Sequence, residues 1–356
     1  MRTNSSPIYF YFPMNNDMDK LTLPKSVTAC WDWQVATANI HDSFGVKEHW
    51  ILQTFLYLKK YGFPCSLVTQ LPTEGIVVSI TDFFPRNYQP SEKLFFIYLV
   101  VDRDKDDQLC GNYFVVHNPH TKFSKAVYHI PPWPQIALIP RSQKRGDRFE
   151  NIGYFGYPWW LVPELKSDVF YNKLQSLGLK WQMPDPAQWN NFSNIDAIVA
   201  VRSFGKNRLF LTKPPLKLFN AWLAGVPSIL GYESAYHAVK KNELDYIEAT
   251  SFDEVIRALK KLKDDRELRH AMVENGNIRI KEFAPSKTVE VWKDLFINIV
   301  IPEYYKWRRT SSFKKKYFFI HRKLFGYVMK LRKIIPFRTQ ALALLYLINR
   351  RFFDSK

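Results

Sequence analysis

Short, almost continuous runs of apolar residues recur along this sequence, each bounded by Gly, Pro or a polar residue. They include GIVVSI (75–80), KLFFIYLVV (93–101) and YFVVHN (113–118) in the first half and IDAIVAVR (195–202) in the second. A continuous apolar run is typical of a parallel strand that helices cover on both faces, because a strand with one solvated face alternates apolar and polar residues. Helical patterns, such as EHWILQTFLYLKKYG (48–62), alternate with such runs along the chain. The sequence therefore predicts an α/β fold with mostly parallel sheets.

The alternation of strands and helices occurs twice, which predicts two domains. Between the two series lies PPWPQIALIPRSQKRGD (131–147), which is rich in proline, then basic, and has no clear periodicity, so we expect a linker there. We therefore expect an N-terminal α/β domain over 1–147 with the linker at its end, a C-terminal α/β domain over 148–300, and a tail over 301–356. A length of 356 residues suits two ordinary domains, and 46% hydrophobic residues exclude a disordered chain.

The net charge of +18 is concentrated at the C-terminal end of the chain. Residues 306–356 contain 15 Lys and Arg residues against the single acid Asp354, whereas the rest of the chain is close to neutral. The high overall charge is therefore no evidence that the two domains bind nucleic acid.

The cysteines and the apolar segments indicate the compartment. Cys30, Cys65 and Cys110 show no paired spacing, which points to a reducing compartment rather than to a disulfide framework. The sequence shows no signal-peptide pattern, and no run approaches the roughly 18–20 apolar residues of a membrane-spanning helix. We expect a cytoplasmic protein.

The segment TKPPLKLFNAWLAGVPSIL (212–230) places Lys213 and Lys217 at the start of an apolar helix that ends at Gly225. The helix dipole disfavours cations there by a few tenths to about 1 kcal/mol each, so a bound anion is expected to offset that cost. Arg202 follows a buried strand, and open parallel sheets bind ligands beyond the carboxyl ends of their strands. Together these groups predict a diphosphate site. The alternative for each lysine alone is a solvated surface position.

At these residues the chain resembles a known family. KPPLKLFNAWLAGVPSILGYESAYHAV (213–239) resembles the donor-site segment of GT-B-fold, nucleotide-sugar-dependent glycosyltransferases, which carry a core like K-x-x-(E/N)-A-x-x-A-G-x-P. The resemblance spans about 149–296, with firm motifs in 196–276, and the N-terminal half matches in architecture only. It implies an α/β fold with two Rossmann-like domains facing a cleft, here followed by a basic helical C-terminal tail.

The resemblance also implies roles for individual residues of the donor site. It places Lys217 on the donor diphosphate, Asn220 where many members carry a ribose-binding Glu, and Glu233 and Ser234 against the ribose or the donor sugar. An amide can bond a ribose hydroxyl, but without the charge-assisted strength of a carboxylate. An acid that a retaining subgroup carries is here Thr212, so retention or inversion stays open. The alternative for Glu233 is an acid that complements the dipole of the next helix.

The remaining chemistry requires a leaving group to be stabilised and a base to be supplied. The D-x-D string within 104–107 lies in a charged loop, so we expect no metal and no cofactor, with fixed cations and the helix dipole stabilising the leaving diphosphate. For the base we favour His41 and Asp42, because an adjacent carboxylate can shift the pKa of an imidazole. Asp82 and Asp102, near strand ends, are the alternatives, and His41 could equally be a plain loop residue.

The tail segment 313–336 has helical periodicity with two distinct faces. One face carries the apolar residues Tyr317, Ile320, Leu324, Val328, Leu331 and Ile335, and the other carries Lys315, Arg322, Lys323, Lys330 and Lys333. A basic amphipathic helix rich in aromatic residues favours an anionic membrane surface as the partner of 306–356. The alternatives are packing on the N-terminal domain, with 286–300 as a crossing helix, and binding of single-stranded nucleic acid.

The sequence as a whole favours a glycosyltransferase that moves a sugar from a nucleotide-sugar to a saccharide or lipid-linked acceptor near a membrane surface. Polysaccharide biosynthesis at the inner face of a membrane fits these features. Two other functions stay open: a nucleotide-sugar epimerase on the same fold, and a non-catalytic protein that binds nucleic acid or an acidic polymer through its tail. The diphosphate site favours the glycosyltransferase and the epimerase over the binding protein. We do not expect nucleic acid as a partner.

Overall fold

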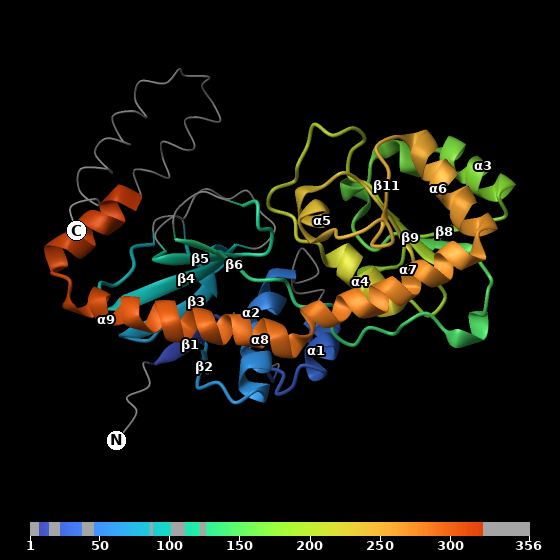
Figure 1. The fold of residues 1–356 in the computed structure, drawn as a ribbon. Helices are drawn as coiled ribbons and strands as arrows, with labels where there is room; N and C mark the ends of the chain where they lie inside the picture. The colour runs from blue at the N-terminus through green and yellow to red at the C-terminus, as the bar shows by residue number, and fades with distance from the viewer. Residues whose placement is uncertain are drawn as a thin grey trace, which may run out of the picture.

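The computed structural model describes residues 7–13, 22–37, 46–85, 88–100, 111–121 and 126–322. They form two α/β domains, each built on its own parallel sheet (Figure 1). The N-terminal sheet has six strands in the order β2-β1-β3-β4-β5-β6. Its strands are β1 (Ile8–Tyr11), β2 (Ser66–Val68), β3 (Gly75–Ile80), β4 (Leu94–Val100), β5 (Tyr113–Val116) and β6 (Val127–His129).

The core of the N-terminal domain confirms the apolar runs as buried strands. All six residues of β3 are buried, and β4 is buried up to its last residue. Helices α1 (Ala29–Thr37) and α2 (Val46–Lys60) contribute to the same core, and α2 ends before Gly62, whose φ of 74° is left-handed.

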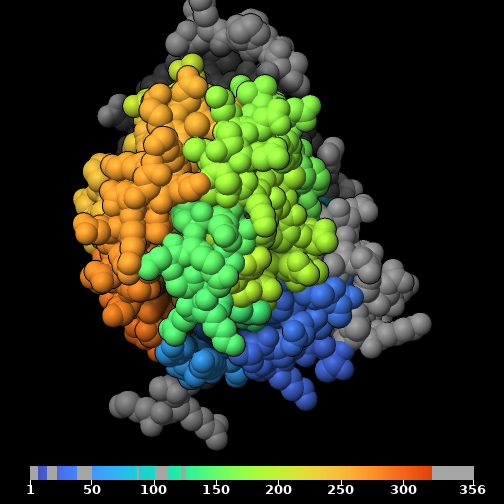
Figure 2. Space-filling model, turned by 90° about the vertical axis from the view of Figure 1, so that its right-hand side faces the viewer, coloured from blue at the N-terminus to red at the C-terminus, as the bar shows by residue number. Residues whose placement is uncertain are grey.

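The C-terminal domain has a five-stranded parallel sheet in the order β11-β10-β9-β7-β8. Its strands are β7 (Asn151–Gly153), β8 (Lys180–Gln182), β9 (Ala197–Ala200), β10 (Ser228–Leu230) and β11 (Ile247–Glu248). Its helices are α3 (Asp168–Ser176), α4 (Leu216–Ala224), α5 (Ser234–Val239), α6 (Phe252–Asp264) and α7 (Arg266–Arg279). Figure 2 faces this domain and shows the dark blue N-terminal residues in direct contact with it.

After the C-terminal domain the chain crosses back to the N-terminal domain (Figure 1). Helix α8 (Pro285–Asp294), a π-helical stretch (Leu295–Val300) and α9 (Ile301–Arg309) follow one another. Their inward side chains belong to the N-terminal core: Val289, Trp292, Leu295, Phe296, Val300, Tyr304 and Trp307. The crossing helix predicted over 286–300 is confirmed, and it continues to 309.

The second half of the predicted linker is fixed on the C-terminal domain. Ile139 pairs with Asn191 in an isolated bridge, and the backbone N–H of Arg141 donates to Ala224 O at 2.9 Å. A short 3-10 turn, 143–145, follows, in which Arg145 is buried and Lys144 stays exposed.

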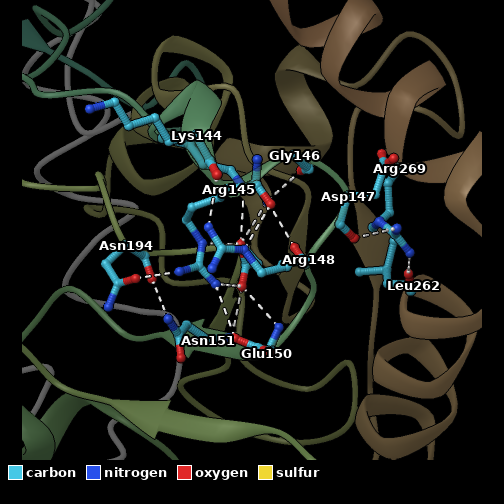
Figure 3. Close-up of polar contacts among 12 residues, drawn as sticks. Lys144, Arg145, Gly146, Asp147, Arg148, Glu150, Asn151, Asn194, Leu262 and Arg269 are labelled. Carbon is cyan, nitrogen blue, oxygen red and sulfur yellow. Dashed lines mark hydrogen bonds and ion pairs between the residues drawn. The ribbon is translucent and has the colours of Figure 1, made fainter.

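Asp196 is the buried anchor of this segment. Figure 3 shows three of the residues that bind it, Arg145, Glu150 and Asn151. The Asp196 carboxylate accepts hydrogen bonds from Arg141 and Arg145 at 2.7–3.0 Å, and from the backbone N–H groups of Glu150 and Asn151 at 2.9 Å. Burial alone raises the pKa of Asp196, but these hydrogen bonds hold it below its ordinary value. The arrangement leaves the proline-rich half of 131–147 as the connection between the domains.

Candidate active site

A cavity of about 390 Å³ lies between the two domains. The N-terminal side contributes Trp31, Gln34, Trp50 and Gln53, and the connecting segment contributes residues 133–136. The C-terminal side contributes β9, the loop after β7 and the start of α4. The cavity therefore lies where strand ends and a helix N-terminus of the C-terminal domain face the N-terminal domain, which is a typical position for a ligand in parallel α/β folds.

Three cations line this one cavity: Arg202, Lys213 and Lys217. Among the described residues that line it there is no Asp and no Glu. A cavity wall that carries three fixed positive charges and no carboxylate among its described residues has a positive potential, which favours an anionic ligand.

Aromatic rings and carbonyl groups position the two lysines. The Lys217 ammonium donates a hydrogen bond to Phe155 O and lies 5.0 Å from the centroid of the Tyr154 ring. The Lys213 ammonium lies 3.8 Å from the centroid of the Trp160 ring, and only 5% of this residue is exposed. Cation–π contacts of this kind are strongest where water is excluded, so both ammonium groups are held at the cavity wall.

Arg202 is paired with Glu233, which is buried at the N-cap of α5. The Glu233 side chain caps no helix amide and is not part of the described cavity lining. Among the described residues its Oε1 has no hydrogen-bond partner. Its contact with the donor therefore stays a prediction, and its observed partner is Arg202.

The structure places the predicted donor ligands Asn220 and Ser234 differently. Asn220 lines the cavity, and its Oδ1 accepts the backbone N–H of Gln135 at 3.1 Å. Ser234 is buried outside the described lining, where its Oγ accepts a hydrogen bond from Asn118 at 2.9 Å. One predicted ribose ligand thus faces the cavity, and the other faces the N-terminal domain.

The start of α4 forms part of the cavity wall. Pro214, Leu216 and Lys217 line the cavity there, Pro215 is the N-cap, and no side chain caps the helix. The helix ends at Gly225, whose φ of 67° is left-handed, as predicted. The positive end of the α4 dipole therefore adds to the charge of the lysines.

The candidates for the base fall mostly outside the described residues. This holds for His41, Asp42 and Asp102, and for the D-x-D string within 104–107. Asp82 is half-buried in a 3-10 turn and is not part of the described lining. Among the described residues there is no group of three or more His, Cys, Asp and Glu side chains that could hold a metal ion.

His117, which no sequence pattern indicated, is buried next to the cavity wall. Its Nδ1 lies 2.7 Å from Ile130 O, and its ring packs edge-on against Trp50 with centroids 4.1 Å apart. Burial lowers the pKa of His117 to about 3, so its imidazole is neutral at neutral pH. Its side chain therefore supports the wall through packing and is not suited to proton transfer at neutral pH.

Tryptophans dominate the apolar part of the cavity wall. Those that line it come from both domains: Trp31, Trp50, Trp133, Trp159, Trp160 and Trp189. Trp159 stacks on Tyr157 with centroids 4.3 Å apart and 10° between the planes, and its other face is exposed. The sequence gives no local pattern for this wall, because these tryptophans are scattered over about 160 positions. The high total of 11 Trp residues is the only feature of the composition that could have indicated an aromatic binding surface.

The two parallel sheets and the cavity between their domains decide the fold class. The chain has a GT-B-type fold. No family model matches the chain, and no curated protein matches it. Within the described residues, no helix is long and apolar enough to span a bilayer.

Several solved structures are similar to this chain. Anabaena HepE in complex with UDP is 11% identical, with a TM-score of 0.45 over 82% of this chain and 100% of that one. A TarM variant of S. aureus, in complex with fondaparinux, alpha-GlcNAc-glycerol and UDP, is 12% identical, with a TM-score of 0.46 over 70% of this chain and 59% of that one. WaaG, a glycosyltransferase involved in lipopolysaccharide biosynthesis, is 11% identical, with a TM-score of 0.40 over 82% and 99%.

Proposed function

We propose that this protein is a glycosyltransferase that binds a nucleotide-sugar in the cavity between its domains and transfers the sugar to an acceptor. The observation that carries the proposal is the cavity wall that joins Arg202, Lys213 and Lys217 to the uncapped start of α4. Its described lining has no Asp or Glu, and the carboxylate that pairs with Arg202, Glu233, lies outside that lining. A diphosphate has the charge and the oxygen atoms to complement these groups. The motif resemblance over 196–276 supports the same ligand.

The same groups account for the chemistry of the proposed transfer. Negative charge develops on the leaving nucleoside diphosphate, and we propose that the Lys217 ammonium and the first amides of α4, which line the cavity, stabilise it. The tryptophan-rich wall offers apolar surface beside these charges. A bound donor that covers this surface would displace water, which strengthens the interactions and disfavours hydrolysis of the donor. The acceptor enters from the N-terminal side of the cavity, and we propose that this domain supplies the base, with His41 and Asp42 as the candidates. We propose that the transfer needs no metal ion or other cofactor.

A nucleotide panel tests the proposal on the full-length protein. We expect nucleoside diphosphates and nucleotide-sugars to raise the melting temperature, and the corresponding nucleosides to raise it far less. For Lys217→Ala we expect transfer to fall about tenfold or more, because one charge-stabilising contact is lost, while the fold survives. Lys180→Ala, at an exposed position of β8, is the matched control and should leave transfer unchanged. The proposal fails if no nucleotide raises the melting temperature, or if Lys217→Ala transfers sugar at the wild-type rate.

The competing functions give different products. An epimerase would convert a nucleotide-sugar without an acceptor, so a modified sugar nucleotide in an acceptor-free reaction would favour it. A binding protein that acts only through its tail would bind acidic polymers equally well after Lys217→Ala. The charged cavity argues against the latter, because a tail binder needs no such site.

We also propose that the acceptor is a saccharide or lipid-linked saccharide at an anionic membrane surface, to which the tail binds. Residues 312–322 are helical, and Phe318 and Phe319 pack on the N-terminal core. The opposite side of this helix leaves Phe313, Tyr317 and Ile320 exposed by 80%, 38% and 58%. Exposed apolar residues at i, i+4 and i+7 form a stripe suited to the interface of a bilayer.

Basic residues accompany this stripe, although not all of them face solvent. Lys314 and Lys316 flank it and are exposed, whereas Lys315 is buried over the Trp307 ring at 5.6 Å. Arg322 lies over the Phe114 ring at 5.8 Å. Of the predicted apolar face, Tyr317 and Ile320 share the exposed side of this helix. Of the predicted basic face, Lys315 and Arg322 lie on the other side and pack over aromatic rings of the protein. The predicted tail residues beyond 322 lie outside the described residues.

Vesicle sedimentation tests the membrane proposal. The wild type should sediment with phosphatidylserine vesicles and not with phosphatidylcholine vesicles, and added salt should weaken the binding. Phe313→Ser combined with Ile320→Ser should reduce it, whereas Ile278→Ser, an exposed apolar position on α7, is the matched control. A truncation should begin at 323, because Trp307, Phe318 and Phe319 stabilise the core. Equal binding by the wild type and the double variant would remove the stripe from the proposal.

A further inference from the structure

The end of β5 in the N-terminal domain makes direct hydrogen bonds to the loop that carries Lys213. Residues 203–215 form this loop, which runs between β9 and α4 in the C-terminal domain. Asn118, two residues after β5, is 1% exposed. Its Nδ2 donates to Lys213 O at 3.1 Å and to Ser234 Oγ at 2.9 Å, and it lies 3.4 Å from Phe210 O.

The Asn118 side chain is fixed from its own domain as well. Its Oδ1 accepts the backbone N–H of His120 at 3.0 Å, which closes a local turn. In the same turn, Thr121 Oγ1 donates to Leu211 O at 2.5 Å. Two side chains of one N-terminal turn thus bind carbonyl groups of the 203–215 loop. The Asn118 amide binds the C-terminal domain through its nitrogen and its own turn through its oxygen.

The loop has a strained backbone at the residue that faces the N-terminal turn. Phe210 has a φ of 48°, in the left-handed region that a bulky residue avoids at a cost of roughly 1–2 kcal/mol. Its carbonyl accepts the N–H of Lys213 at 2.9 Å and faces Asn118. A strained conformation persists only where its surroundings determine it, and here the surroundings include the other domain.

We infer that Asn118 is a positioning residue for the cavity: from the N-terminal domain it sets the backbone position of Lys213, so that the cationic wall is complete only when the two domains are docked. This inference rests on the proposed function for its consequence, since Lys213 is one of the three cations proposed to bind the diphosphate. The contact itself involves only residues of this chain. It couples the acceptor side of the cavity to the donor side.

The sharpest variant is Asn118→Asp. The carboxylate keeps the oxygen that accepts the His120 N–H, so the local turn survives. It replaces the amide donor by an oxygen that faces the carbonyl groups of Lys213 and Phe210, so the contact between the domains becomes repulsive. Asn191→Asp is the matched control: Asn191 Oδ1 also closes a local turn, onto the N–H of Ser193 at 3.0 Å, and its side chain is exposed.

Labelling of lysines with an amine reagent, followed by mass spectrometry, measures the effect without any nucleotide. Lys213 is almost fully buried and should react slowly in the wild type. In Asn118→Asp we expect its labelling rate to rise about tenfold, because the loop opens more often. Lys315, buried in the tail, is the internal control and should react at an unchanged rate in both variants. An unchanged Lys213 rate in Asn118→Asp would overturn the inference.

Two further measurements keep the outcome decisive. If Lys315 also reacts faster in Asn118→Asp, the variant has unfolded, and Thr121→Val is used instead. Thr121→Val removes one hydrogen bond to the 203–215 loop and should raise the labelling rate of Lys213 severalfold. An unchanged labelling rate of Lys213 in Thr121→Val would overturn the inference. With the nucleoside diphosphate that gives the largest shift in the panel, Asn118→Asp should weaken binding about tenfold; unchanged affinity would overturn the positioning role. Failure of every nucleotide to bind the wild type would contradict the proposed function, whereas the labelling rates would still decide the contact between the domains.

Discussion

A single methyl group at Gly156 tests the placement of the Lys217 ammonium. Gly156 follows β7 and lines the cavity. A Cβ added there would lie 2.8 Å from Lys217 Nζ and 3.0 Å from Tyr154 Oη. Non-bonded carbon and nitrogen atoms are comfortable at about 3.5–4.0 Å, so the ammonium must move by roughly 1 Å. The lysine side chain is flexible, and the Tyr154 ring needs to give by only a few tenths of an ångström, so Gly156→Ala should displace the charge and leave the fold intact.

The expected magnitude follows from the contact that is disturbed. A hydrogen bond to a charged group contributes about 1.5–3 kcal/mol, and a displacement of roughly 1 Å removes part of it. We therefore expect the affinity for a nucleoside diphosphate to fall about tenfold, which corresponds to about 1.4 kcal/mol. Isothermal titration calorimetry at one salt concentration measures this change, and thermal unfolding confirms that the variant folds.

A double-mutant cycle shows whether the methyl group acts through Lys217. In a Lys217→Ala background, Gly156→Ala should have almost no further effect on the affinity, because the group that it displaces is gone. The reasoning is refuted if Gly156→Ala weakens binding by the same factor in both backgrounds. It is also refuted if the single variant binds as tightly as the wild type.

Two further predictions concern stability. Asp196→Asn removes the charge that Arg141 and Arg145 surround, so it should lower the free energy of unfolding by about 3–5 kcal/mol in urea titrations, and a loss below about 1 kcal/mol would contradict the buried anchor. In the folded state the His117 imidazole stays neutral down to about pH 3, whereas in the unfolded chain it binds a proton below about pH 6.5. Protonation therefore favours the unfolded chain, so the stability that the neutral imidazole contributes is present above pH 6.5 and is lost as the pH falls. Between pH 7.5 and 5.5 the free energy of unfolding should fall by about 1.4 kcal/mol more in the wild type than in His117→Gln, and an equal pH dependence would exclude a buried neutral imidazole.

The sequence predicts those parts of the fold in which burial leaves a local pattern. The strands β3, β4, β5 and β9 are buried on both faces and therefore appear as continuous apolar runs. The strands β6 and β8 have only three residues each and are partly exposed, so they give no such run and were not predicted. The connecting segment is predictable only in part. In the sequence Arg145 resembles a solvated cation of a linker, and only the fold brings its partner Asp196, 51 positions away, into contact with it.

The site follows the same division between local and distant signals. Lys213, Lys217 and the start of α4 are neighbours in the sequence, and with Arg202 at the end of the preceding strand they can be grouped from the order of the residues alone. Asn118 cannot be assigned to the site from the order of the residues, since its hydrogen-bond partners lie 92 to 116 positions away in the other domain. The tryptophan wall was missed for the same reason, because only the docking of the domains brings its members together.

The comparison of a nucleoside diphosphate with its nucleoside is the most direct test of the central claim, which is that the cavity between the domains recognises a diphosphate. Calorimetry on the full-length protein should show at least tenfold tighter binding of the diphosphate, and Lys217→Ala should remove most of that difference while leaving the affinity for the nucleoside unchanged. Equal affinities for the two ligands in the wild type would contradict the claim.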